Sequence, residues 1–255
     1  MKNMLGELST HFEMDTVDWL LMALVGMIVG MSKVGIGGFY AAVIPIMAFI
    51  FGPKASTGVL VPILIFADIM AVSYYRRAAT WKYIRQLLPW TFVGLGLGVW
   101  IGDMIDDQTF KNVLAVVVLG GAAILVWLEI RKLKEIPDYP WFSAVIGILG
   151  GFSTIVGNFA GPVMTVYLLS MRLPKTGFIG TAAWFFFIIN LVKIPFHLFV
   201  WKTVTWSSFQ LDLWIIPTII LGAVLGIQLV KLFSESFFRQ FTIAFTVLSA
   251  LLIFL

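Results

Sequence analysis

The chain has 255 residues, of which 60% are hydrophobic and only 12% are charged, and its formal net charge is +4. Soluble globular domains carry about 25% charged residues, so this composition excludes a soluble core and predicts a polytopic membrane protein. An excess of Lys and Arg then reflects cytoplasmic loops and gives no reason to expect nucleic-acid binding. The chain has no cysteine, which excludes disulfides, thiolate metal sites and cysteine nucleophiles.

The chain is divided into two sets of five apolar segments, whose continuous runs favour an all-α bundle over a membrane barrel. An N-terminal tail at 1–16, without the basic start of a signal peptide, is followed by a first transmembrane repeat at 17–130. A polar linker at 131–140 precedes a second repeat at 141–255. The segments are 17–31, 38–51, 57–75, 87–105, 111–129, 141–157, 159–171, 178–201, 211–232 and 237–255.

The two sets share sequence features in the same order, which indicates an internal repeat. The matched features are Gly26 and Gly30 with Gly147 and Gly151, Pro53-Lys54 with Pro174-Lys175, and the glycines of 94–98 with those of 222–226. Because each set has an odd number of segments, the two repeats are expected to be inverted relative to each other. This is the arrangement of many secondary transporters, which bind their solute near the midplane between the repeats.

The distribution of charge between the loops predicts the orientation of the chain. Arg76, Arg77, Lys82 and Arg85 follow the third segment, and this loop is expected in the cytoplasm. The acidic loop at 102–107 and the N-terminal tail then fall outside, whereas the linker falls inside, as do Arg172, Lys175 and Lys231.

Two segments, 38–51 and 159–171, are too short to span a bilayer unaided, and each follows a break rich in glycine and small polar residues. Either these segments form re-entrant hairpins or the helices are tilted and broken; both place the breaks inside the protein. Glycine allows close backbone approach, and helix N-termini near Gly38 and Gly161 would favour an anion. The candidate substrate ligands in the breaks are Ser32, Lys33, Gly35, Gly37, Gly38, Ser153, Asn158 and Gly161.

A polar stripe on the eighth segment supplies further candidates. Asn190, Lys193 and His197 share one helix face, and Asn190 aligns with Asp68 of the first repeat. We expect Asn190 and Lys193 to bind substrate. Asp68 and His197 are candidates for proton coupling, but Asp68 could equally pair with a lysine and His197 could lie at the membrane interface. Glycines can also serve only helix packing, and lysines can extend to the interface.

Catalytic and cofactor patterns do not occur in the sequence. Two distant histidines cannot form a zinc site of the HExxH type, and Lys33 precedes its glycines, so this stretch is not a phosphate-binding loop. We therefore expect no enzyme activity, no metal and no cofactor. Uphill transport would depend on an ion gradient or on the membrane potential.

Four strings resemble those of the TauE/SafE family of membrane permeases, which is named for sulfite and sulfoacetate exporters. They are 26–38 (GMIVGMSKVGIGG), 156–162 (VGNFAGP), 171–175 (MRLPK) and 178–190 (FIGTAAWFFFIIN). The resemblance covers nearly the whole chain after the tail, although the second break is less glycine-rich than is usual in the family. It implies transport of small organosulfur anions or sulfur oxyanions.

Together these features predict a secondary transporter in the plasma membrane that moves sulfite, a sulfonate or a related carboxylate. A passive anion channel of the same fold and a non-transporting scaffold are the alternatives. The expected partners are the small anion and the lipid bilayer, with no nucleic acid; a homo-oligomer is left open.

Overall fold

The computed structural model describes residues 14–35, 37–101 and 139–252, and all of its regular elements are helices. The first part of the chain forms α2 (Thr16–Lys33), η1 (Gly37–Ala42), α3 (Val43–Phe51), α4 (Pro53–Tyr75) and α5 (Trp81–Ile101). The second part forms α7 (Pro140–Gly157), α8 (Ala160–Ser170), α9 (Lys175–Pro195), η3 (Phe196–Val200), α10 (Trp206–Leu232) and α11 (Glu235–Leu252). The expected segment 111–129, the acidic loop with Asp103, Asp106 and Asp107, and nearly all of the tail and the linker lie outside the described residues.

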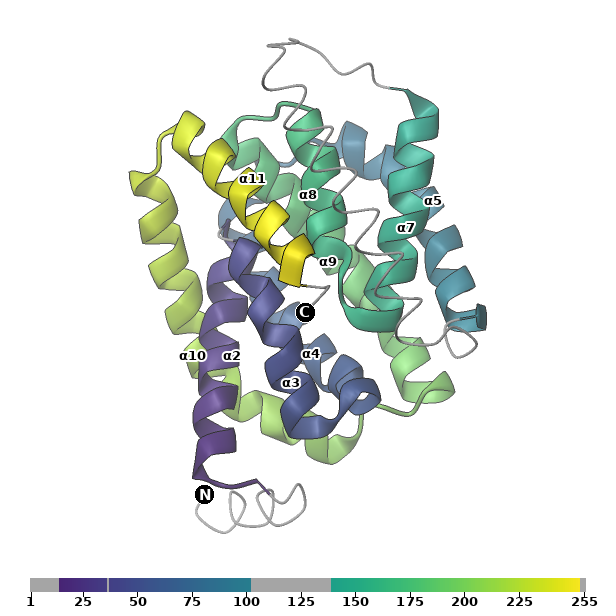
Figure 1. Cartoon of the computed structure of the whole chain (residues 1–255), viewed down its shortest axis with the longest axis vertical. Coiled ribbons are helices and arrows are strands. Elements are labelled where there is room, and N and C mark those ends of the chain that lie inside the picture. The colour runs from purple at the N-terminus through teal and green to yellow at the C-terminus, as the bar shows by residue number, and fades with distance from the viewer. Residues whose placement is uncertain (1–13, 36, 102–138, 253–255) are drawn as a thin grey trace.

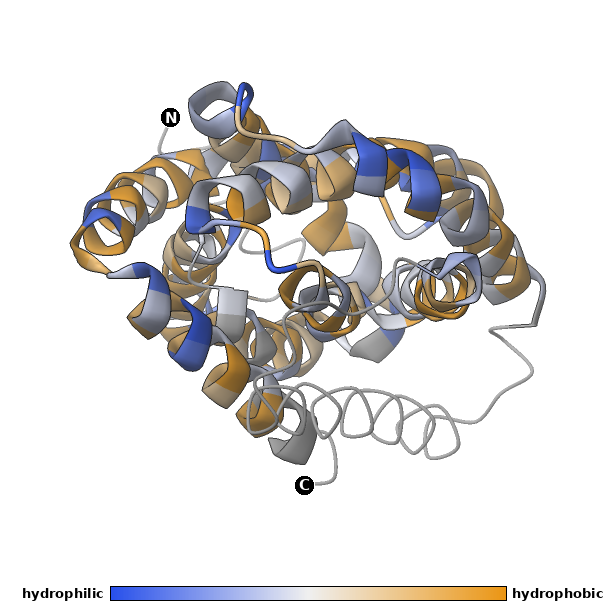
Figure 2. Ribbon diagram, turned by 90° about the horizontal axis from the view of Figure 1, so that it is seen from above, coloured by the Kyte–Doolittle hydropathy of each residue, from blue (hydrophilic) through white to orange (hydrophobic). Residues whose placement is uncertain are grey.

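Five of the described helices are long and apolar enough to cross a membrane, which confirms the polytopic all-α bundle. They are Thr16–Lys33, Lys54–Tyr75, Pro140–Gly157, Lys175–Val200 and Trp206–Leu232. Two short helices accompany them: α3 has 9 residues and α8 has 11. At 1.5 Å per residue these helices reach only about 14 and 16 Å, roughly half of a hydrocarbon core. Figure 2 shows that most of the helical ribbon is hydrophobic, with short, separated hydrophilic stretches.

Several helices extend further than the sequence predicted. α2 continues to Lys33, two residues past the predicted segment, whereas α7 ends at Gly157 as predicted. Lys33 and Ser153 therefore both lie in helices, and the breaks are shorter than the strings rich in glycine and small polar residues. α5 begins at Trp81, so Lys82 and Arg85 belong to a helix and not to the preceding loop. Charged residues at a helix end look like loop residues in a hydropathy pattern, although the backbone there is helical.

The glycines that match between the two repeats lie where four helices pack in two close pairs. In α2, a Cβ added at Gly30 would lie 2.2 Å from the carbonyl oxygen of Ile219 in α10. In α7, a Cβ added at the matching Gly151 would lie 2.0 Å from the carbonyl oxygen of Thr91 in α5. Small residues allow backbones to approach closely in membrane helices, where burial of apolar surface gives little driving force. Equivalent glycines thus make equivalent contacts in both halves.

We expect Gly151→Ala to destabilise the protein by about 1–3 kcal/mol, because the added methyl group forces α5 and α7 apart. Gly96→Ala on α5 is the matched control: no atom of the described residues lies within 4 Å of a Cβ there, and alanine favours a helix by about 0.5–1 kcal/mol over glycine. Thermal unfolding of the purified variants in detergent measures both effects. Equal midpoints for the two variants would contradict close packing at Gly151.

The two halves run in opposite directions where their first helices can be compared. Figure 1 shows α2 starting at the end of the molecule marked N, whereas α7 starts at the opposite end. Between the close pairs α2–α10 and α5–α7, α4 packs against α9. At the ends of α2 and α7, Lys33 contacts α4 at Asp68, and Asn158 contacts α4 at Thr57 and α9 at Lys193.

Basic side chains gather at the end where α10 finishes. The Nζ atom of Lys175 donates hydrogen bonds to the carbonyl oxygens of Val230 and Phe233, at 2.9 and 2.6 Å. Arg239 donates to the carbonyl oxygen of Leu169 at the end of α8, at 3.0 Å. Cations are stabilised at helix C-termini by the unpaired carbonyl groups. Lys175 and Lys231 both lie at this end. It is therefore the end that the sequence predicts to face the cytoplasm.

Candidate functional site

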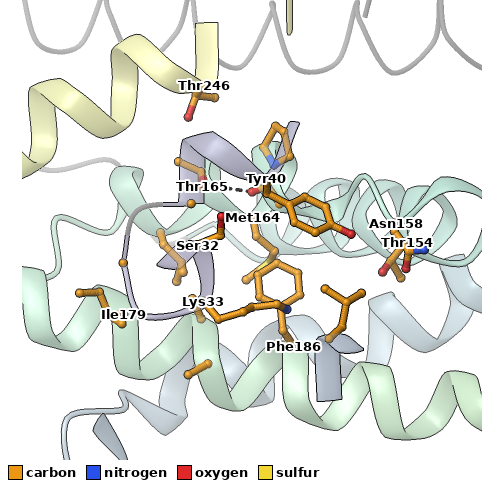
Figure 3. A pocket seen from close by; sticks show the side chains of 18 of the residues that line it. Ser32, Lys33, Tyr40, Thr154, Asn158, Met164, Thr165, Ile179, Phe186 and Thr246 are labelled. Atoms are coloured by element: carbon orange, nitrogen blue, oxygen red, sulfur yellow. Dashed lines mark hydrogen bonds between the residues drawn. The ribbon is translucent and has the colours of Figure 1, made fainter. Parts of the chain in front are cut away.

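A cavity of about 100 Å³ lies where the two breaks meet α9. α2 contributes Ser32 and Lys33, η1 contributes Tyr40, and the end of α7 contributes Thr154 and Asn158 (Figure 3). Asn190 and Phe186 of α9, Thr165 of α8, and Thr242 and Thr246 of α11 also line the cavity, and most of the remaining lining is apolar. One water needs at least about 10–15 Å³ of such accessible space, so this cavity has room for several waters or one small anion.

The first break turns the chain sharply after Lys33. Gly35 has φ +127°, a conformation that residues with a side chain rarely adopt. A Cβ at this position would also lie 2.6 Å from a side-chain carbon of Ile179. The turn leaves the side chain of Lys33 in the cavity wall, where its Nζ atom lies 2.9 Å from Asp68 Oδ1 and 4.4 Å from the centre of the Phe186 ring.

The second break is built around Asn158, which ends α7 in the left-handed conformation with φ 57°. Asparagine tolerates this conformation better than most residues with a side chain. The Asn158 side-chain amide donates to the carbonyl oxygen of Thr57 in α4 at 3.1 Å, and its Oδ1 atom accepts a hydrogen bond from Lys193. The break is therefore tied to both central helices.

A continuous polar network joins the two breaks through α4 and α9. Asn190 donates to Asp68 Oδ2 at 2.6 Å, and Asn190 Oδ1 accepts from Lys193 at 3.3 Å. Lys193 also lies 3.4 Å from the Thr154 hydroxyl oxygen and, with Asp68, is fully buried. The network thus contains two lysines and one carboxylate, a formal charge of +1. A buried charge is costly unless it is paired, so an excess cation favours an anion nearby.

Two hydroxyl groups that line the cavity have no hydrogen-bond partner among the described residues. They are Ser32 Oγ and Tyr40 Oη, and both atoms are buried. An unpaired buried polar group typically costs about 1–3 kcal/mol, and such groups in native structures often mark a site that a water or a ligand completes. Both hydroxyls can donate to an anion in the cavity.

The structure brings most of the sequence-predicted site residues together. Those that line the cavity are Ser32, Lys33, Gly35, Gly37, Asn158, Gly161 and Asn190. Asp68 and Lys193 contact lining residues from behind, and Gly38 lies in η1. Ser153 instead donates to the carbonyl oxygen of Gly150 at 3.1 Å, within α7.

His197 lies outside the cavity lining. Its Nδ1 atom is 2.8 Å from the Thr203 hydroxyl oxygen, and its ring makes an edge contact with Trp201. The side chain is fully buried at the π-helical turn η3, so it does not occupy an exposed interface. His197 was expected on the same helix face as Lys193, but the helix changes to a π-helical repeat at Phe196, between the two residues.

Nothing in the sequence indicated that Tyr40 and Phe186 belong to the site. Each lies in an apolar run, where an aromatic residue is expected in the core or against lipid, and only the geometry distinguishes them. No group of three or more His, Asp or Glu side chains that could hold a metal occurs within residues 14–35, 37–101 and 139–252.

The model of a protein family described as "Sulfite exporter TauE/SafE" matches residues 22–253. This range contains the whole polar network and both breaks. Comparisons with curated proteins and with solved structures give no significant match.

Proposed function

The chain belongs to the sulfite exporter TauE/SafE family, as its motifs predicted, and we propose that it is a secondary transporter of a small sulfur oxyanion such as sulfite or a sulfonate. The family implies a multi-pass membrane transporter of sulfur-containing anions and not an enzyme. The identity of the anion, the plasma membrane as its location and the site between two inverted repeats belong to the proposal.

The observation that carries the proposal is a cavity with free donors and an excess of positive charge. Ser32 Oγ and Tyr40 Oη are buried hydroxyls without a partner in the described part of the chain, and Lys33 lies in the same wall. An oxyanion has several acceptor oxygens and needs hydrogen-bond donors around it, so it complements this set. Hydrogen bonds to charged groups are about twice as strong as neutral ones.

An alternating-access mechanism is supported by the relation between the halves. Equivalent glycines pack α2 on α10 and α7 on α5, and α2 and α7 run in opposite directions in Figure 1. Asp68 and Asn190, which align in the two repeats, are hydrogen-bonded to each other. We infer an axis of approximate two-fold symmetry near this pair, so that motion of one half against the other would expose the cavity to either side.

Uptake into liposomes that contain the purified protein tests the proposed function. We expect sulfite or a small sulfonate to enter faster than into protein-free liposomes, with saturation and with competition among these anions. A macroscopic conductance in planar bilayers would favour the passive channel instead. If sulfite, thiosulfate, sulfonates and short carboxylates all fail to enter, transport is contradicted. The non-transporting scaffold would then be the favoured alternative.

Tyr40→Phe removes one unpaired hydroxyl and keeps the ring, and equilibrium binding of the anion to the purified protein measures the effect. A hydrogen bond to a charged group contributes about 1.5–3 kcal/mol, so the Kd of the anion should rise about ten- to hundredfold. The control is Tyr74→Phe, since Tyr74 is half exposed on α4 and does not line the cavity. An unchanged Kd in Tyr40→Phe would remove this hydroxyl from the proposed site.

A further inference from the structure

Lys33, the cation that lines the cavity, is already paired with a buried carboxylate, that of Asp68. The Lys33 ammonium group lies 2.9 Å from Asp68 Oδ1, and Lys33 lines the cavity with 11% of its side chain exposed. Asp68 is fully buried on α4 and does not line the cavity. A carboxylate on one side of the ammonium group and an oxyanion on the other would therefore compete for the same charge.

The charged and titratable groups around Asp68 come from several helices. α2 supplies Lys33, whereas α9 supplies Lys193, which reaches Asp68 through Asn190. Tyr40 of η1 lines the cavity beside Lys33. α3 and α7 have no titratable residue in their described ranges. α10 carries Asp212 and Lys231; Lys231 lies over the ring of Tyr74, at the far end of α4.

We propose that Asp68 binds the proton that couples transport, so that one proton and one anion occupy the site together. This inference rests on the proposed function. When a proton from solvent binds a carboxylate oxygen of Asp68, the carboxyl group becomes neutral and the ion pair with Lys33 is lost. The Lys33 ammonium group can then pair with the anion. When the proton leaves, Asp68 pairs with Lys33 again and the anion is released. For a monovalent anion, the net charge of the site is the same before and after the proton and the anion bind together.

Asn190 makes this exchange structurally feasible. Its side-chain amide donates to Asp68 Oδ2 at 2.6 Å, and this hydrogen bond does not depend on a proton at Oδ1. The carboxyl group therefore keeps one fixed partner while its other oxygen alternates between Lys33 and a proton. Lys33 also contacts the Phe186 ring, 4.4 Å from the ring centre, and this contact does not involve Asp68.

Two other buried groups are less suited to this role. The carboxylate of Asp212 is fully buried on α10, and neither of its oxygens has a hydrogen-bond partner among the described residues. Within the described part of the chain Asp212 makes no ion pair with Lys33, the cation that lines the cavity, so its protonation would not release that cation. His197 contacts Thr203 and Trp201 and lies outside the cavity lining.

The test follows proton entry and anion entry together in liposomes that contain the full chain and an internal pH-sensitive dye. The probe is radiolabelled 2-hydroxyethanesulfonate, because a sulfonate is the anion of a strong acid and carries no proton of its own at neutral pH. For the wild-type protein we expect about one proton to enter with each anion, and an inward proton gradient to drive accumulation. Asp68→Asn, which resembles the protonated carboxyl group in shape, should move the anion downhill but without protons and without accumulation.

Asp212→Asn is the matched control and should keep the coupling of the wild-type protein. The proposal is overturned if wild-type protein moves the sulfonate or sulfite without protons, or if Asp68→Asn still moves protons. The proposal is also overturned if coupling depends on another residue. In that case Asp212→Asn or Lys193→Gln loses coupling while Asp68→Asn keeps it. Anion uptake without protons contradicts coupling at Asp68 but not the proposed function. Absence of any anion uptake contradicts both the proposed function and the coupling.

If Asp68→Asn does not fold, the wild-type protein alone still decides the question. Under the proposal, anion binding takes up one proton, so the affinity for the sulfonate falls as the pH rises through the titration of the site. Calorimetry in two buffers of different ionisation enthalpy measures that proton directly. Binding with no proton uptake contradicts the proposal.

Discussion

Replacing Lys193 with glutamine should weaken anion binding by roughly a hundredfold. Lys193 is fully buried, and its ammonium group is held by Asn158, Thr154 and Asn190, which are all neutral. The charge of Lys33, in contrast, is opposed by Asp68. Lys193 therefore supplies the net positive charge of the network. At an effective dielectric constant of 20, a unit charge about 5 Å from an anion contributes about 3 kcal/mol, roughly a hundredfold in Kd.

Glutamine is chosen because its amide group can still donate a hydrogen bond towards Asn158, so the variant loses the charge with little loss of packing. The control is Lys202→Gln, which removes an equal charge from an exposed position in the loop after η3. Equilibrium binding to the purified protein and uptake in liposomes should both fall in Lys193→Gln alone. An unchanged Kd in this variant would place the anion away from the network.

Much of the fold follows from patterns visible in the sequence. The lengths of the short segments predicted α3 and α8 near their observed positions, since hydropathy changes over a few residues at each break. The order of glycines predicted which positions are equivalent, and Gly30 and Gly151 indeed face backbone of another helix. The partner helices were not predictable, because a small residue allows close approach without specifying what approaches. The inverted arrangement as a whole stays a prediction.

The site was only partly predictable for a similar reason. Polar residues in an apolar chain are conspicuous, so Lys33, Asn158 and Asn190 could be selected. The sequence could not decide whether Asp68 pairs with a lysine, and the structure shows that it lies 2.9 Å from Lys33. Tyr40 was missed, because an aromatic residue gives no signal until its hydroxyl group is found buried without a partner in the described part of the chain.

The second large effect concerns stability and the same ion pair. Lys33→Met should destabilise the protein by about 3–5 kcal/mol, because it leaves the buried carboxylate of Asp68 without its counter-ion. Asp68→Asn should cost less, since Lys33 is partly exposed to the cavity and keeps its contact with Phe186. The double variant should recover most of the loss, because no unpaired charge then stays buried.

A double-mutant cycle on unfolding in detergent isolates this coupling. Lys175→Met combined with Asp68→Asn is the control cycle: Lys175 caps the carbonyl groups of Val230 and Phe233 at the end of α10, and no contact joins it to Asp68 in the described residues. Its two effects should add, whereas those of Lys33→Met and Asp68→Asn should not. If the Lys33 cycle is additive as well, the ion pair contributes nothing to the folded state. Asp68 would then have no bond to exchange for a proton, and the argument for coupling at this residue would fail with it.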